Sequence, residues 1–217
     1  MEKTAVTMKN YHEVRLPYDE RRDLLWKTLC DAYFQPLIHE GACVLELGAG
    51  YCHFINHIRC ARRIALDLWE GMPAHAAPGV EPIIASTTNL GAVPDHCVDF
   101  AFASNLFEHL TQDELSQTLA QLRAKLAPGG SLNILQPNYR FAYREYFDDL
   151  NHRTVYSDRS LSDFLSCHGL KVIYCAPRFL PLTIKSALPV SPLLIRLYLR
   201  LPFKPLGKQM LIRAVVA

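Results

Sequence analysis

One stretch of the sequence decides the fold: Val44-Leu45-Glu46-Leu47-Gly48-Ala49-Gly50-Tyr51-Cys52-His53-Phe54. Its first four residues predict a short buried strand. Gly48 and Gly50 then predict a tight turn, because glycine adopts backbone conformations that other residues avoid. Residues 54–58 predict the start of a helix. Strand, glycine turn and helix in this order bring backbone N–H groups close to a nucleotide-like ligand, although Cys52 stands near the place of the third glycine of the dinucleotide fingerprint.

Strand and helix patterns alternate after this turn. Thr111 and Glu114 form a predicted capping box at the start of one helix, which ends before Pro128-Gly129-Gly130. A second helix is predicted over residues 157–167. The remaining strands are predicted at residues 62–68, 80–85, 97–103, 131–136, 170–176 and 208–216. This alternation predicts an α/β, Rossmann-like sheet of seven mostly parallel strands, with helices on both faces and an antiparallel last strand.

Composition indicates an ordinary globular chain. The chain has 217 residues, of which 50% are hydrophobic and 20% are charged. The start, Met1-Glu2-Lys3-Thr4, lacks the apolar core of a signal peptide, and no run of 18 uncharged apolar residues occurs. The seven cysteines contain no CxxC pair, so we expect reduced thiols, a cytoplasmic location and no metal site.

Charge is distributed unevenly along the chain. Residues 1–163 contain 15 basic and 21 acidic residues, whereas residues 164–217 contain eight basic residues and no acidic one. Within this basic tail, residues 192–201 predict a short apolar helix with Arg196 and Arg200 on one face. Lys185, Lys204 and Lys208 flank it, so residues 185–208 are typical of a helix that lies on an anionic membrane surface. A lid helix over a pocket and a dimer contact are the alternatives.

Asp67 ends the second predicted strand, 21 residues after Glu46. An acid about 20 residues after the glycine turn meets the ribose hydroxyls in dinucleotide-binding folds. A carboxylate suits that role because its two oxygens accept hydrogen bonds from neighbouring hydroxyls. Trp69 follows closely, and its flat side chain is suited to packing on an adenine ring.

Five motifs in order resemble the class I S-adenosylmethionine-dependent methyltransferases of the type 11, or ubiquinone/menaquinone-biosynthesis-like, group. The motifs are Glu46-Leu47-Gly48-Ala49-Gly50, Asp67, Pro94-Asp95-His96-Cys97-Val98-Asp99, Asn105 to Leu110 and Leu126-Ala127-Pro128-Gly129-Gly130. The resemblance covers residues 42–136 well and the flanks loosely. It implies S-adenosyl-L-methionine as cofactor and methyl transfer as the reaction.

The resemblance also implies roles for individual residues. Gly48 and Gly50 would approach the methionine part of the cofactor, and Glu46 would lie behind them as an anchor near its ammonium group. Asp67 would accept hydrogen bonds from the ribose hydroxyls. The other implied cofactor-binding residues are Leu68, Thr87 and Thr88 on the adenosine side and Ser104 and Asn105 on the methionine side. Many relatives have an aspartate where Thr87 stands, so this chain departs from the pattern there.

A hydroxyl acceptor would need a general base. The first candidate is His152, because the polar and aromatic loop after the fifth strand should cover the acceptor pocket, and His109 is the second. Tyr139, Arg140 and Asp149 are candidates for the acceptor pocket, with Arg140 suited to a phosphate or carboxylate. The alternative for both histidines is a structural role in ordering the loop.

We expect a single methyltransferase domain over residues 1–217. Residues 1–41 would form a helical cap, residues 42–136 the cofactor-binding core and residues 137–217 the acceptor side, including a basic apolar insertion at residues 177–206. The predicted function is O-methylation of a small-molecule, glycan or lipid-linked acceptor. The alternatives are a non-catalytic cofactor-binding regulatory module, an N- or C-methyltransferase of a quinone-like or other small molecule, and a nicotinamide oxidoreductase. No nucleic-acid partner is expected, because the basic tail lacks an aromatic and basic platform.

Overall fold

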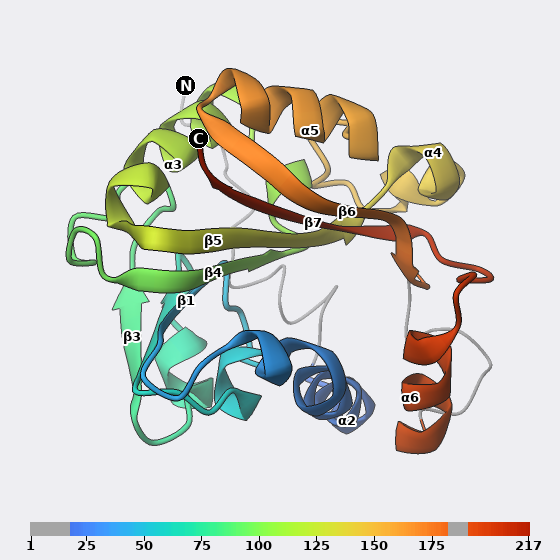
Figure 1. The fold of residues 1–217 in the computed structure, drawn as a ribbon, viewed down its shortest axis with the longest axis horizontal. Coiled ribbons are helices and arrows are strands. Elements are labelled where there is room, and N and C mark those ends of the chain that lie inside the picture. The colour runs from blue at the N-terminus through green and yellow to red at the C-terminus, as the bar shows by residue number, and fades with distance from the viewer. Residues whose placement is uncertain (1–17, 182–190) are drawn as a thin grey trace, which may run out of the picture.

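Seven strands form one sheet in the computed structural model, which describes residues 18–181 and 191–217 (Figure 1). The strands are β1 (Cys43–Leu47), β2 (Arg62–Asp67), β3 (Val80–Ile84), β4 (Val98–Ser104), β5 (Leu126–Pro137), β6 (Leu170–Leu180) and β7 (Gln209–Val216). Their order across the sheet is β3-β2-β1-β4-β5-β7-β6. The first five strands pair in parallel, and β7 pairs antiparallel with both β5 and β6. The predicted Rossmann-like α/β sheet with an antiparallel last strand is therefore confirmed.

Helical segments connect the strands. The α-helices are α2 (Glu20–Leu29), α3 (Gln112–Lys125), α4 (Tyr139–Ala142), α5 (Asp158–Cys167) and α6 (Pro192–Arg200). The shorter segments are the π-helix η1 (Cys30–Phe34) and the 3-10 helices η2 (Gln35–Leu37), η3 (Ile55–His57), η4 (Met72–His75), η5 (Phe107–His109) and η6 (Tyr146–Asp148). Within the predicted helical cap 1–41, the described residues contain α2, η1 and η2.

Two hydrophobic layers hold the helices to the two faces of the sheet. Side chains alternate along a strand, so Leu45 of β1 packs on one face and Val44 on the other. The first layer contains buried residues of α3 and α5, and the second contains residues of α2, η1 and α6. Figure 1 shows α3 and α5 above the sheet and α2 below it.

Two helices begin with reciprocal caps, and the sequence predicts the first of them. The Thr111 hydroxyl accepts the Glu114 N–H, and the Glu114 carboxylate accepts the Thr111 N–H at 2.7 Å. Ser157 and Ser160 make the same reciprocal pair at the start of α5. These caps fix where each helix leaves the sheet edge, because they satisfy N–H groups that a helix start leaves unpaired.

The prediction of a helix after the glycine turn is wrong about the length of that helix. Only one turn of 3-10 helix, η3, follows the turn, and Ile58 is already extended. The Ile55 N–H donates to the buried Glu46 carboxylate at 3.0 Å instead of starting a longer helix. A single turn has no N-terminal anion site, so the helix start contributes less to ligand binding than the sequence predicts.

Two strand limits also differ from the prediction. β5 begins at Leu126 and runs through Pro128-Gly129-Gly130, because Leu126 already pairs with Val98 before an irregularity in the ladder. A Cβ at Gly130 would lie 2.5 Å from the Val98 carbonyl oxygen, so glycine is needed there for the strands to approach. β6 continues to Leu180, into the region predicted as an insertion.

The apolar helix of the basic tail is present as α6. Ile195, Tyr198 and Leu199 pack into the second hydrophobic layer, whereas Leu193 and Leu197 are at least half exposed. Within residues 18–181 and 191–217, no helix is both long and apolar enough to cross a membrane. Residues 182–190 of the predicted insertion, which include Lys185, and residues 1–17 of the predicted cap lie outside the described residues.

Candidate active site

The predicted cofactor residues gather at one edge of the sheet, where the parallel strands β1, β2 and β4 end. The glycine turn follows β1, Asp67 is the last residue of β2, and Ser104 is the last residue of β4. Carboxyl ends of parallel strands share an edge, and ligands of such sheets bind there.

Backbone hydrogen bonds tie the glycine turn to β2. The N–H groups of Gly48 and Ala49 both donate to the Leu66 carbonyl oxygen, at 2.8 and 3.1 Å. Gly48 has φ +67°, and a Cβ there would lie 2.8 Å from a methyl group of Leu106. Gly50 has φ +50°. Both glycines therefore occupy the left-handed backbone region that the predicted turn requires.

Asp67 is held by two backbone donors. Its Oδ2 accepts the Gly50 N–H at 2.7 Å and its Oδ1 accepts the Trp69 N–H at 2.8 Å, and the side chain is buried. Each carboxylate oxygen can accept a second hydrogen bond. One acceptor position on each oxygen fits a pair of neighbouring hydroxyls, so Asp67 and the turn are compatible with the ribose of S-adenosylmethionine.

Glu46 and Cys52 complete the turn. Glu46 is 5% exposed, and its burial raises the pKa of the carboxyl well above its usual value. Its hydrogen bond to the Ile55 N–H places it behind the turn, as a brace for the backbone. Cys52 is buried with φ +57°, which is the conformation that the missing glycine would adopt without strain.

An aromatic cluster lies beside Asp67. Trp69 stacks on His75 with ring centroids 5.3 Å apart and meets Tyr51 edge-on at 5.0 Å. Tyr18 adds a fourth ring to the cluster and meets Tyr51 edge-on. The sequence analysis singled out Trp69 alone. Tyr51 is within the glycine turn itself, and its place there was the signal that it would lie near the ligand edge.

Three other predicted cofactor residues differ in their surroundings. The Thr87 hydroxyl is buried and pairs with Thr118 of α3 at 2.9 Å, and Thr88 pairs with Ser86. Leu68 is 54% exposed. The predicted contacts of these three residues with adenosine remain predictions.

Asn105 is positioned by its neighbours at the end of β4. Its side chain donates to the Ser104 hydroxyl at 3.1 Å and accepts from Gln209 of β7 at 2.8 Å. Asn105 has φ +47°, and its N–H donates to Leu135 of β5. The sequence analysis missed Gln209, because nothing in the sequence brings the start of the last strand to this edge.

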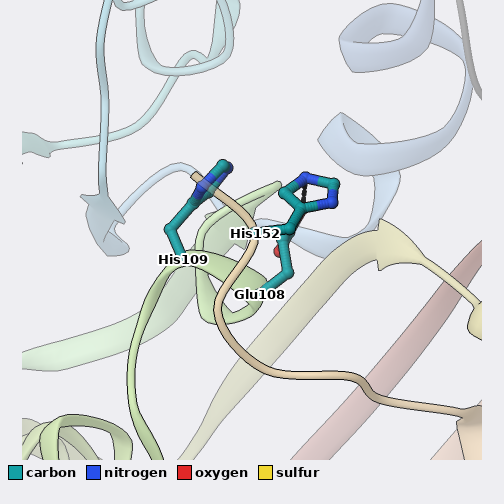
Figure 2. A group of neighbouring side chains, drawn as sticks. All are labelled: Glu108, His109 and His152. Atoms are coloured by element: carbon teal, nitrogen blue, oxygen red, sulfur yellow. Dashed lines mark ion pairs between the residues drawn. The ribbon is translucent and has the colours of Figure 1, made fainter. Parts of the chain in front are cut away.

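The two candidate bases meet in the structure. His109 ends η5, and His152 comes from the loop after η6; their ring centroids are 4.9 Å apart. Figure 2 shows the imidazole of His152 next to the carboxylate of Glu108, with an Nε2–Oε1 distance of 4.0 Å. Ligand-type atoms of Glu108, His109 and His152 all lie within 4.8 Å of one another. We call these three residues the Glu-His-His cluster.

Glu108 is an unusual member of this cluster. The residue is 0% exposed, and among the described residues no hydrogen-bond donor reaches either carboxylate oxygen. Burial, together with the charge of the nearby Asp149, raises the pKa of Glu108 to about 8. Burial and the neighbouring His152 lower the pKa of His109, which favours the neutral imidazole.

Backbone contacts hold the two segments of the cluster together. The Glu108 carbonyl oxygen accepts the N–H groups of Arg153 and Thr154 at 2.8 and 3.1 Å. His109 Nδ1 lies 3.2 Å from the Asn151 carbonyl oxygen. Tyr146, which the sequence analysis missed, is buried with its ring 4.6 Å from that of His152.

The predicted acceptor residues flank this cluster. Asp149 accepts the Asn151 N–H, and its charge acts on both Glu108 and His109. The Tyr139 ring packs edge-on against Tyr146 at 5.2 Å.

Arg140 is partly engaged elsewhere. Its guanidinium donates to both carboxylate oxygens of the buried Asp158, at 3.0 and 3.1 Å. An anionic acceptor would therefore share Arg140 with Asp158.

Comparisons with known proteins bear on the family and the fold of the chain. A family model described as "Methyltransferase domain" matches residues 45–134. No curated protein matches the chain.

Solved structures match the fold of nearly the whole chain. A putative methyltransferase from Haloferax volcanii, solved in complex with the Trm112 activator, is 17% identical with a TM-score of 0.71, and the match covers 99% of each chain. A methyltransferase from Archaeoglobus fulgidus is 19% identical with a TM-score of 0.68, over 97% of this chain and 99% of the other. The DhpI–SAH complex is 19% identical with a TM-score of 0.58, over 96% and 91%.

Proposed function

We propose that this chain, whose residues 45–134 match a methyltransferase domain, is a class I S-adenosylmethionine-dependent methyltransferase that methylates an oxygen atom of a small-molecule, glycan or lipid-linked acceptor. The observation that carries the proposal is the Glu-His-His cluster. Its first member, Glu108, follows Asn105, which is proposed to line the cofactor, by three residues in the chain. A neutral imidazole next to a bound hydroxyl can accept its proton during transfer.

The cofactor would lie along the edge formed by the ends of β1, β2 and β4. Asp67 would accept hydrogen bonds from the ribose hydroxyls with the acceptor positions that Gly50 and Trp69 leave open. Gly48 and Gly50 would allow close approach to the methionine part, and Ser104 and Asn105 would line it. The predicted contacts of Glu46, Leu68, Thr87 and Thr88 belong to the same proposal, with Glu46 acting through the turn.

The acceptor would lie between this edge and the loop after β5. When bound, S-adenosylmethionine supplies an electrophilic methyl group: the acceptor oxygen forms the new bond to carbon while the carbon–sulfur bond breaks and its electron pair remains on sulfur. His152 is the first candidate to take the hydroxyl proton and His109 the second, and either passes it to water. Holding the two reactants in line is the larger contribution, since positioning can supply about 7–11 kcal/mol of the barrier.

Acceptor recognition would use the side chains around the cluster. Tyr139 and Asp149 would contact the acceptor, and Arg140 would pair with an anionic group on it. We propose that residues 42–136 bind the cofactor and that residues 137–217 form the acceptor side.

The exposed part of the basic tail supports a lipid-linked acceptor or a membrane surface. Leu193, Leu197 and Phe203 are 67%, 50% and 69% exposed, and Arg196 and Arg200 are exposed on the same helix. Apolar and cationic side chains together are typical of helices that lie on anionic membranes. We propose peripheral attachment through α6 and the residues after it.

Two of the basic residues predicted for this surface are occupied. Lys204 donates to the carbonyl oxygens of Tyr198, Leu199 and Leu201 and so caps α6. Lys208 pairs with Glu145. Among the described residues of this surface, Arg196 and Arg200 therefore remain as the cations that would meet lipid.

Labelled methyl transfer tests the proposed reaction. The purified chain, given methyl-labelled S-adenosylmethionine and cell extract, should label a product whose methyl group is bound to oxygen, and His152→Asn should label at least tenfold less. A methyl group on nitrogen or carbon would overturn O-methylation. No labelled product in the lipid or the aqueous phase would favour a non-catalytic module.

Vesicle binding tests the proposed membrane surface. Replacing Arg196 and Arg200 by Gln should weaken binding to vesicles with anionic lipid roughly 30-fold, from about 1 kcal/mol for each arginine. Arg159→Gln on α5 is the matched control and should bind as the unaltered chain does. Equal binding of the unaltered chain to neutral and anionic vesicles would contradict the proposal.

A further inference from the structure

The Glu-His-His cluster has the composition of a metal site. Two imidazoles and one carboxylate are the ligands of many catalytic zinc and iron sites, whereas Mg²⁺ and Ca²⁺ prefer oxygen ligands alone. The three ligand atoms already lie within 4.8 Å of one another without any ion present. The sequence analysis predicted no metal site, because the residues come from two segments 43 positions apart and match no ligand spacing.

The environment of Glu108 favours a cation. Its carboxylate is fully buried, and in the described part of the chain neither oxygen receives a hydrogen bond. The guanidinium of Arg153, the residue after His152, pairs with Glu114 instead. Buried carboxylates are ordinarily hydrogen-bonded, paired or bound to metal. A divalent ion would supply the missing partner.

The two imidazoles are prepared as ligands. His109 Nδ1 lies 3.2 Å from the Asn151 carbonyl oxygen, and donation to that oxygen places the lone pair of the neutral ring on Nε2. Metal-binding histidines commonly donate their other ring N–H to a carbonyl oxygen in this way. His152 Nε2 is 4.0 Å from Glu108 Oε1 and faces the same space (Figure 2).

We propose that Glu108, His109 and His152 bind one divalent transition-metal ion of the zinc type. Ligand bonds of about 2.0–2.2 Å would draw the three side chains closer together than they now lie. Three protein ligands leave a position open, as catalytic sites do.

This inference deepens the proposed function and rests on it for the location of the acceptor. An acceptor hydroxyl bound at the open position would lose its proton to water more readily, because a bound cation lowers the pKa of a coordinated oxygen. The two imidazoles would then hold the ion, and neither would act as the base.

Direct metal binding tests the site. The full chain, stripped with a chelator and dialysed, is titrated with Zn²⁺ by calorimetry, and Co²⁺ is used as a visible-absorption probe. We expect one equivalent of Zn²⁺ and the absorption bands of a Co²⁺ site with nitrogen and oxygen ligands. Glu108→Gln and His152→Asn should each bind Zn²⁺ at least tenfold more weakly.

A matched control distinguishes this cluster from other histidines. Asp23 also has two histidine neighbours, His53 and His57, so His57→Asn removes an imidazole from a similar group elsewhere. This variant should bind Zn²⁺ as the unaltered chain does. If Glu108→Gln does not fold, His152→Asn, whose side chain is 10% exposed, carries the test alone.

Two results would overturn the metal site. The first is uptake of less than one tenth of an equivalent of Zn²⁺ by the unaltered chain. The second is an unchanged Zn²⁺ affinity in both Glu108→Gln and His152→Asn. S-adenosylhomocysteine binding by the metal-free chain is measured in parallel. If the metal-free chain binds S-adenosylhomocysteine but no metal ion, the proposed methyltransferase function stands with an imidazole as the base. If it is absent, the proposed function fails independently of the metal.

Discussion

Asp67 and Glu108 are buried carboxyl groups near the same edge of the sheet, and they are supported in opposite ways. Asp67 accepts two backbone N–H groups at 2.7 and 2.8 Å. Glu108 accepts none from the described residues, and burial raises its pKa to about 8. The backbone therefore fixes Asp67 as a permanent acceptor, whereas Glu108 is costly to bury unless something binds it. On the proposed cofactor side, backbone N–H groups hold the buried carboxylate. On the proposed acceptor side, the buried carboxylate of Glu108 needs a further binding partner.

The largest expected effect comes from Asp67→Asn. The amide would present an NH₂ group to one of the two N–H donors and would offer the ribose one acceptor fewer. Losing a hydrogen bond to a charged group costs about 1.5–3 kcal/mol, which corresponds to roughly a 10–100-fold weaker affinity for S-adenosylhomocysteine. Calorimetry measures this affinity, and Asp163→Asn, exposed on α5, is the control. An affinity within twofold of the unaltered chain would remove Asp67 from the cofactor site.

Glu108→Met should raise the stability of the metal-free chain. Replacing a buried polar group without partners by an apolar side chain of similar shape removes a desolvation cost of about 1–3 kcal/mol. We expect the metal-free variant to melt about 2–4 °C higher for each kcal/mol gained, while Asp67→Asn melts lower. Thermal unfolding of both variants checks the opposite signs. A lower Tm for Glu108→Met would show that its carboxyl group is satisfied.

Asp23 provides an intermediate case in which histidines support a carboxylate. Burial raises the pKa of Asp23, but hydrogen bonds from His57 at 2.8 Å and His53 at 3.4 Å lower it on balance. A carboxylate with a lowered folded-state pKa contributes stability above its unfolded pKa of about 3.9, and loses it as the pH falls through the folded value.

Denaturant unfolding at several pH values tests this contribution. The unaltered chain should be more stable than Asp23→Asn at pH 6, and the difference should shrink toward pH 3. A difference that grows as the pH falls would contradict the assignment.

The smallest effect is expected at the glycine turn. Cys52 has φ +57°, a conformation that costs a non-glycine residue about 1–2 kcal/mol. Cys52→Gly would relieve that strain but would lose the burial of the thiol, so we expect a change in unfolding free energy within about 1 kcal/mol. Urea unfolding measures it. A loss well above that value would show that the turn depends on the cysteine side chain.

The sequence predicted the local structure of the proposed cofactor side better than that of the proposed acceptor side. Gly48, Gly50 and Asp67 belong to a local strand-turn-strand pattern, in which spacing along the chain fixes position in space. Gln209 and Tyr146 reach the site from distant segments, and a single sequence carries no signal for such contacts. His109 and His152 were predicted separately, but their meeting with Glu108 depends on how the loop after η6 crosses the end of β4.

The predicted helix after the turn failed for a local reason. The Glu46 carboxylate takes the Ile55 N–H, and β2 begins at Arg62, so only one helical turn fits between them. Tertiary contacts of this kind override helix patterns in short connections.

Calorimetric titration of the unaltered chain with S-adenosylhomocysteine tests the central claim most directly. The account predicts one site per chain with a dissociation constant in the micromolar range or tighter, and no heat of binding with NAD under the same conditions. Absence of binding at millimolar S-adenosylhomocysteine, or equal binding of NAD, would contradict it.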